Sequence, residues 1–183
     1  METRFENVTV DTEGQLRTLF VALNKKSTIR TVVVFLVLLA AFTLFQVYLW
    51  ELGRWAGSPL TMEDLRPYII VVILYIVLII NAVLRPGRAA KKVYLRTLEY
   101  YDNSMPAATH RFYDDYFVSS DVDSTHISPY RKLSKVEIKG ELVLLIRKDG
   151  KVMHMNTAGF TKGTLADFCQ FIQMKTNMPI IQK

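Results

Sequence analysis

The hydrophobic residues of this chain are concentrated in two long blocks. Residues 31–50 carry no charged side chain, and residues 68–84 form a second uncharged block. At about 1.5 Å per residue, a helix of roughly 20 residues matches a hydrocarbon core about 30 Å thick. Pro67 suits the first position of a helix, so we place the second helix at residues 67–84. The pattern predicts a transmembrane hairpin over residues 31–84, since two helices buried in a soluble core need no runs of this length.

The charges that flank the two blocks predict their orientation. Lys25, Lys26 and Arg30 precede the first block, whereas the connecting residues 51–67 carry only two basic side chains. Five further basic residues follow the second block, and loops with excess Lys and Arg stay on the cytoplasmic side. We therefore expect a multi-pass protein of the cytoplasmic membrane with both termini in the cytoplasm. The basic residues expected to contact anionic lipid headgroups are Arg85, Arg88, Lys91, Lys92 and Arg96.

A few polar and aromatic side chains lie within or beside the blocks. Gln46 and Asn81 are the only amides there, and they lie near opposite ends of an antiparallel hairpin, so no shared site is expected. We expect them to bond to headgroups, water or another helix. The aromatic residues expected at the membrane interface are Tyr48, Trp50, Trp55 and Tyr68.

Composition and charge narrow the function classes. Half of the 183 residues are hydrophobic, and the formal net charge is +6. Up to Leu84 the chain carries 7 Lys and Arg against 7 Asp and Glu, so the excess lies entirely after it. Because five of those basic residues adjoin the second block, the charge indicates a membrane surface instead of nucleic acid. The chain has one cysteine, Cys169, which excludes an internal disulfide. No cleavable signal peptide is expected.

Residues 1–30 are expected to form an N-terminal cytoplasmic segment. Residues 5–10 suit a short strand, and Thr12 with Gln15 forms the capping box of a helix that runs to about residue 24. This helix has one apolar face, which packs either on the C-terminal domain or in the membrane interface. The face consists of Leu16, Leu19, Phe20 and Leu23.

Residues 85–109 are expected to form a basic juxtamembrane helix and a linker, and residues 110–183 a small β domain. Asp149-Gly150 is a strong hairpin signal, and Gly163-Thr164 opens an amphipathic helix whose apolar face carries Phe168. Five antiparallel strands closed by one helix follow the pleckstrin-homology-like plan. The expected strands are residues 111–113, 116–119, 130–139, 141–148 and 152–157, and the expected apolar sheet face is Val136, Ile138, Leu142, Leu144 and Ile146.

The chain resembles the YcxB-like family of small bacterial membrane proteins. The resemblance rests on the two blocks, the segments HRFYDDYFVSS and ISPYRKLSKVEI, the hairpin ELVLLIRKDGKVMHM and the helix TLADFCQFIQ. It covers residues 31–175. It implies an α+β membrane protein in which a two-helix hairpin anchors a pleckstrin-homology-like cytoplasmic domain, and it assigns no biochemical activity.

No residue pattern indicates catalysis, a cofactor or a metal. The three histidines lack a ligand spacing, and His154 is expected to be exposed or at a rim. The pairs Asp114 with Asp115 and Asp121 with Asp123 are expected to be polar turns, and Cys169 a buried, inert thiol. A basic stretch can face either water or lipid headgroups, and its members are Arg131, Lys132, Lys135 and Lys139.

Two functions of different classes fit these observations. The first is a non-catalytic, membrane-anchored interaction or regulatory module with a protein partner or a second copy of the chain. The second is an immunity protein that protects the membrane against a toxin or an antimicrobial peptide. An enzyme is the third alternative, and the absence of a catalytic set argues against it.

Overall fold

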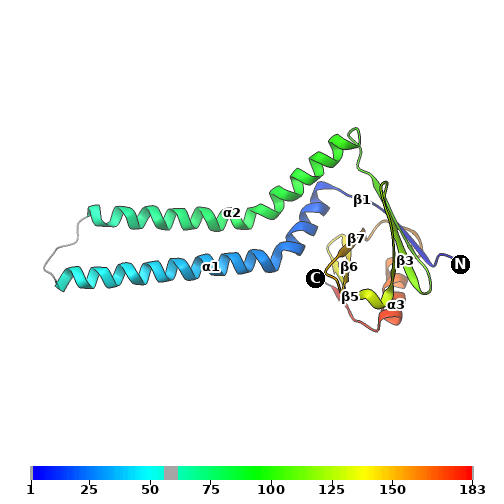
Figure 1. The fold of residues 1–183 in the computed structure, drawn as a ribbon. Helices are drawn as coiled ribbons and strands as arrows, with labels where there is room; N and C mark the ends of the chain where they lie inside the picture. The colour runs from blue at the N-terminus through cyan, green and yellow to red at the C-terminus, as the bar shows by residue number, and fades with distance from the viewer. Residues whose placement is uncertain (1, 56–61, 183) are drawn as a thin grey trace. The chain divides into compact units, whose positions relative to one another are not determined.

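The computed structural model describes residues 2–55 and 62–182, with side chains except at residues 55 and 62–65. Trp55 of the expected aromatic belt therefore lies outside the described side chains. The chain divides into two compact units (Figure 1), a β unit of Met1–Leu19 and Lys91–Lys183 and a helical unit of Phe20–Ala90. The protein is α+β, with two long apolar helices and a sheet domain.

Two helices, α1 (Glu13–Trp55) and α2 (Met62–Tyr100), provide the helical unit and extend beyond it at one end each. The expected N-terminal helix therefore does not end near residue 24, because no Pro or Gly separates it from the first apolar block. Pro67 lies inside α2 instead of at its first position, and Pro86 also lies inside it. Each proline removes one backbone N–H donor from the helix.

Both helices are long and apolar enough to cross a membrane, and none of the apolar window of either is buried inside the protein. The helices contact each other through rings, with Phe35 against Tyr75 at 6.3 Å and Phe42 stacked on Tyr68 at 6.0 Å between ring centres. The stacking shows that Tyr68 of the expected aromatic belt also contacts the other helix through Phe42.

The described part of the β unit contains nine strands in two sheets. The first sheet has the order β4-β3-β2-β1-β8 and the second the order β7-β6-β5-β9. The strands are β1 Phe5–Val10, β2 Ala107–Phe112, β3 Tyr116–Ser120, β4 Thr125–Pro129, β5 Leu133–Lys139, β6 Leu142–Arg147, β7 Val152–Asn156, β8 Phe160–Lys162 and β9 Ile180–Gln182. One short 3₁₀ helix, Tyr130–Lys132, precedes β5.

The N-terminal strand belongs to the same sheet as the C-terminal part of the chain. β1 pairs antiparallel with β2, with Val10 opposite Ala107, and its other edge pairs with β8. The strand expected at residues 5–10 is confirmed, but it does not belong to a separate N-terminal segment. The β domain is thus built from two segments instead of residues 110–183 alone, and the helical hairpin is inserted between two paired strands.

The start of α1 is also part of the β unit. Thr12 and Gln15 form the expected capping box, with N···O distances of 3.1 and 3.2 Å. Gln15 Nε2 also donates to Glu141 at 3.3 Å, and Leu16 and Leu19 are buried. The part of the expected apolar face up to Leu19 therefore belongs to the β unit, whereas Phe20 and Leu23 belong to the helical unit and Leu23 is 49% exposed.

The two expected hairpins are confirmed, and three short strands were missed. Asp114 and Asp115 connect β2 to β3, and Gly150, with φ of 82°, lies in the turn between β6 and β7. The missed strands are β4, β8 and β9, of which the last two have three residues each. Because β9 runs parallel to β5, the second sheet is mixed instead of wholly antiparallel.

The core lies between the sheets and under α3 (Leu165–Thr176), which Figure 1 shows beside the β strands. Residues opposite each other on paired strands share a face, so Leu145 joins Val136 and Val143 joins Ile138. The expected apolar face was therefore wrong for β6. Leu142 and Leu144 are buried on the opposite face of the sheet, since β6 is buried on both sides.

Phe168 is the central core residue of α3. Its ring contacts Phe5, Phe112 and Phe160 at centroid distances of 5.7, 4.7 and 5.2 Å, which joins α3 to three strands of the first sheet. Cys169 lies at the edge of this face and is half-buried instead of buried, and its partial burial raises the pKa of the thiol. The core role expected for Phe168 is confirmed.

Candidate functional site

All three histidines of the chain line one pocket of the β unit. This inter-sheet pocket has a volume of about 440 Å³ and receives side chains from β1 to β4 on one sheet and from β6 and β7 on the other. The sequence predicted no such association, because the histidines are far apart along the chain. The pocket is lined by Thr9, Asp11, Pro106, Ala108, His110, Phe117, Ser119, Asp121, His126, Ser128, Arg147, Lys151, Val152, Met153 and His154.

His110 is the most buried of the three histidines. It lies on β2 between Asn7 of β1 and Ser119 of β3, and only 3% of its surface is exposed. Neither ring nitrogen has a hydrogen-bond partner among the described residues. Burial, with a smaller effect of nearby His154, lowers the pKa of His110 to about 4. The ring is therefore neutral at pH 7, with one N–H donor and one acceptor nitrogen.

Arg147 lies at the end of β6 and reaches across to the first sheet. Its Nη1 donates to Ser128 Oγ on β4 at 3.2 Å, and its Nη2 donates to Asp149 at 2.7 Å. The Nε atom is buried and has no partner in the described part of the chain. A buried N–H without an acceptor is costly, so this guanidinium has one strong donor whose hydrogen-bonding capacity is unused in the structure.

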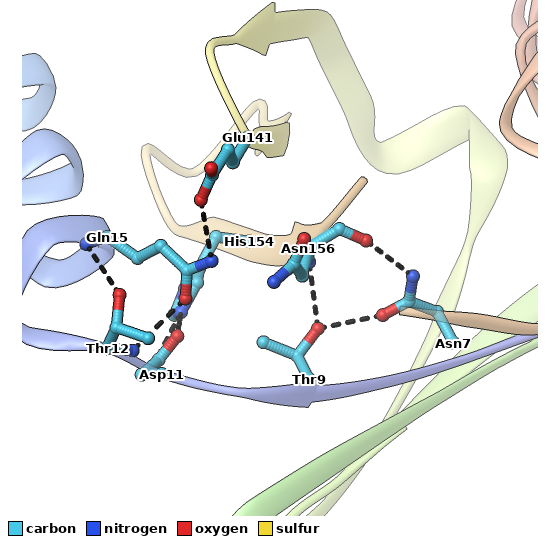
Figure 2. Close-up of polar contacts among 8 residues, drawn as sticks. All are labelled: Asn7, Thr9, Asp11, Thr12, Gln15, Glu141, His154 and Asn156. Carbon is cyan, nitrogen blue, oxygen red and sulfur yellow. Dashed lines mark hydrogen bonds and ion pairs between the residues drawn. The ribbon is translucent and has the colours of Figure 1, made fainter. Parts of the chain in front are cut away.

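A row of polar side chains joins β1 to β7 beside the pocket (Figure 2). Asn7, Thr9 and Asp11 recur at every second position, so they lie on one face of the chain. Asn7 Nδ2 donates to the Asn156 carbonyl at 2.8 Å, and Thr9 Oγ1 accepts from the Asn156 N–H at 2.9 Å. We call Asn7, Thr9, Asp11, His154 and Asn156 the polar seam.

His154 is part of this polar seam and lies at the rim of the pocket, which is one of the two positions expected for it, with 23% of its side chain exposed. Its Nε2 lies 2.8 and 3.0 Å from the two carboxylate oxygens of Asp11. The alternation of β7 did not predict this partner, because Asp11 belongs to the chain that follows β1.

A histidine bonded to an aspartate can act as a general base for a neighbouring nucleophile. Within residues 2–55 and 62–182, His154 has no bonded serine, threonine or cysteine. Ser124 lies 3.5 Å from His126 Nε2, but its hydroxyl donates to Asp121 at 2.9 Å. The pocket therefore offers donors and acceptors for binding, and neither histidine activates a nucleophile among the described side chains.

Asp121 and Asp123 occupy the turn between β3 and β4. Asp121 Oδ1 accepts from the backbone N–H groups of Asp123 and Ser124 at 3.1 and 2.6 Å. These bonds and that from the Ser124 hydroxyl, the largest effect, lower the pKa of Asp121. Asp123 accepts from the Tyr101 hydroxyl at 2.6 Å. Across the described residues, no group of three or more His, Cys, Asp or Glu side chains can hold a metal ion.

The other candidate side chains lie outside the pocket. Asp114 pairs with Arg4 at 3.2 Å on the surface, where about half of the Asp114 side chain is exposed, and Asp115 is exposed, so both lie in the polar turn that was expected. Lys135 of the basic stretch pairs with Glu137 of the same strand. Asn81 accepts from Arg88 Nη1 at 2.7 Å, so its partner is a basic residue two turns further along α2. The five residues expected at the membrane surface are all exposed along α2.

The signal for this pocket was present in the sequence but weak. The segment NVTVD at residues 7–11 alternates small polar with apolar side chains, as a strand does when a polar face is covered. What the sequence lacks is the pairing that brings β1 to β7 and β2 to the centre of the sheet. No family model matches this sequence, and no curated protein does either, so the site is interpreted from its geometry.

Proposed function

We propose that this protein is a non-catalytic, membrane-anchored interaction or regulatory module that presents a pleckstrin-homology-like β domain to the cytoplasm. The observation that carries the proposal is the insertion of two uncharged, outward-facing helical segments between the paired strands β1 and β2. Exposure of this apolar surface to water is unfavourable, whereas its contact with the hydrocarbon core of a bilayer is favourable.

The pairing of β1 with β2 supports a hairpin whose two ends lie on the same side of the membrane, independently of the flanking charges. β1 precedes the first apolar segment and β2 follows the second, yet their residues are hydrogen-bonded neighbours. If each helix crosses the membrane once, both ends of the hairpin emerge on the side where this sheet folds. The excess of basic residues beside the second segment favours the cytoplasm and contact with anionic lipid.

The pleckstrin-homology-like assignment is supported by the two sheets and the closing helix α3. The inserted hairpin agrees with the resemblance to YcxB-like proteins, because that resemblance extends from the apolar segments to α3. The inter-sheet pocket supports the binding role. It combines a covered His-Asp pair with unused donors, and its described residues hold no bonded nucleophile.

Membrane insertion is tested first by extraction of isolated membranes. An integral protein stays with the membrane at high pH and in high salt, because lipid contact by apolar helices does not depend on charge. The full chain should therefore remain in the pellet after alkaline carbonate treatment and enter the supernatant only with detergent. Release by carbonate alone would contradict the anchoring role.

Orientation is tested by cysteine labelling, which the single native cysteine makes simple. In a Cys169→Ser background, Met174→Cys on α3 and Glu2→Cys near β1 place thiols at exposed positions of the β unit. Leu52→Cys places one near the far end of α1, where 56% of the side chain is exposed. A membrane-impermeant maleimide should label Leu52→Cys in intact cells and the other two only after permeabilisation. The reverse pattern would invert the proposed orientation.

A further inference from the structure

We propose that the inter-sheet pocket binds a small organic carboxylate, with its oxygens on Arg147 Nε and His110 and its apolar part along Phe117 and Met153. The inference rests on the binding role proposed for the β domain and adds the chemical class of the ligand. Three features support this ligand class: the acidic side chains of the pocket wall are already paired, several donors are not, and the pocket has the size and apolar lining for an organic body.

The acidic groups of the pocket wall are already engaged. The Asp11 carboxylate contacts His154 with both oxygens, and Asp121 accepts three hydrogen bonds from its own turn. Asp149, beside the pocket, accepts from Arg147 Nη2. These carboxylates therefore present little unused capacity to a ligand that carries positive charge or many donors.

The unused groups are mainly donors. Arg147 Nε is buried without a partner, and a neutral His110 has one N–H to donate. Lys151 also lines the pocket, and no ion pair of Lys151 occurs among the described residues. A carboxylate only accepts hydrogen bonds and has two oxygens, so it is complementary to a site whose unused groups are donors.

The pocket is larger than a simple inorganic anion requires. Its volume of about 440 Å³ lies in the range of small-molecule sites. Part of the wall is apolar, with Phe117 almost fully buried and Val152 and Met153 half-buried. A ligand with a short apolar body would cover these side chains while its carboxylate bonds to the donors. Small-molecule sites commonly combine an apolar lining with a few polar groups that orient the ligand.

The histidines themselves provide the measurement. The chain contains 3 histidines and all of them line the pocket, so the imidazole signals of a nuclear magnetic resonance spectrum report on it directly. The full-length protein in lipid nanodiscs is titrated with acetate, butanoate and hexanoate at constant pH. We expect saturable shifts of the His110 ring signals that strengthen with chain length. Hexanol has the apolar chain without the carboxylate, and inorganic phosphate has negative charge without an apolar chain. Both should cause much weaker shifts.

A matched pair of variants assigns the carboxylate contact. Arg147→Gln should weaken hexanoate binding by about tenfold or more, because it removes the charged donor. Arg131→Gln makes the same change at an exposed arginine outside the pocket and should leave binding unchanged. Equal binding by the two variants would overturn the role of Arg147. If Arg147→Gln disturbs the fold, the comparison of hexanoate with hexanol on the unmodified protein decides the question.

Each remaining outcome separates this inference from the proposed function. Hexanol binding as well as hexanoate would show an apolar site without anion recognition and overturn the proposal. If phosphate binds as tightly as hexanoate, the ligand needs no apolar body, and the assignment to an organic carboxylate is overturned. If no carboxylate gives a saturable shift up to about 10 mM, well above ordinary ligand affinities, water is the occupant and the proposal is wrong. Anchoring and orientation would still be judged by extraction and labelling.

Discussion

In the helical unit, large apolar side chains point outward, whereas in the β unit they point inward. Leu44 and Ile70 are 71% and 66% exposed, while Phe112 and Phe168 are fully buried. Both arrangements follow from the same preference of apolar surface to avoid water. The described residues do not cover the apolar surface of the helical unit, and the bilayer that we propose would cover it.

The two units also differ in how they treat polar groups. In the β unit, most buried polar groups are bonded, and the exceptions among the described side chains are the ring nitrogens of His110 and Arg147 Nε. In the helical unit, Thr43 donates to the Leu39 carbonyl of its own helix, and its hydroxyl lies 3.5 Å from that of Tyr68 on the other helix. Buried polar groups without a partner are unusual, and both exceptions in the β unit line the pocket for which we propose a ligand.

The largest effect is expected from the core of the β unit. Phe168→Ala removes a fully buried ring with three aromatic neighbours, and such changes cost about 3–5 kcal/mol. Met174→Ala is the matched control on the same helix, because this side chain is 76% exposed. Thermal unfolding of the full chain in detergent, followed by near-ultraviolet circular dichroism, should separate the two variants clearly. Equal melting temperatures would mean that α3 is not part of the core.

A charge in the outward face of α1 tests the other side of the comparison. Leu38 is 47% exposed and lies near the middle of the first apolar block. If its surrounding is lipid, Leu38→Asp should oppose insertion by about 2.5–3.5 kcal/mol, whereas Leu38→Ala should insert normally. Glycosylation mapping in microsomes measures the inserted fraction. Equal insertion of the two variants would show that this face does not contact lipid.

Much of the fold was predictable because its signals are local. The two apolar blocks, the turn at Gly150 and the capping box of Thr12 with Gln15 each depend on a few neighbouring residues, and each lies where the sequence predicted it. Phe168 was assigned to the core from the spacing of one helix face. These features need no knowledge of distant pairing, since periodicity and turn chemistry specify them.

The site was not predictable in the same way. His110, His154 and Arg147 come together only because β1 pairs with β2 across an insertion and β7 packs on β1. Strand phase placed His154 opposite Met153 and Met155 but did not predict its contact with Asp11, since alternation distinguishes two faces but not what covers each. The short β8 and β9 have three residues each, too few for periodicity to identify them.

Acid should destabilise the β unit through His110. The pKa of this group falls from 6.5 to about 4 in the folded state, so the unfolded chain takes up the proton first as the pH falls. Its contribution to stability is complete above pH 6.5 and is lost as the pH falls toward 4. By pH 5 the loss should be about 2 kcal/mol.

Urea unfolding of the full chain at pH 7.5 and pH 5 measures this loss. His110→Gln should reduce the difference between the two pH values, because it removes the buried titrating group. His126→Gln, at an exposed histidine of the same pocket, should leave the difference nearly unchanged. The same pH dependence in all three proteins would place its origin outside His110. The exposed helical unit should contribute little, since its apolar side chains do not titrate.

The smallest effect is expected from the cap of α3, which tests how the β unit keeps Phe168 in place. Thr164 Oγ1 accepts from the Asp167 N–H at 3.2 Å and its hydroxyl donates to the Asp167 carboxylate at 2.7 Å. Loss of such a cap costs about 1 kcal/mol, because an N–H at the helix start then loses its acceptor. Thr164→Ala should therefore lower the urea midpoint of the full chain slightly, and Thr164→Ser should restore it, since serine keeps the hydroxyl. If serine fails to restore the midpoint, the threonine methyl group and not the cap is responsible. In that case α3 would be held by packing alone, as the helices of the helical unit are held by their ring contacts.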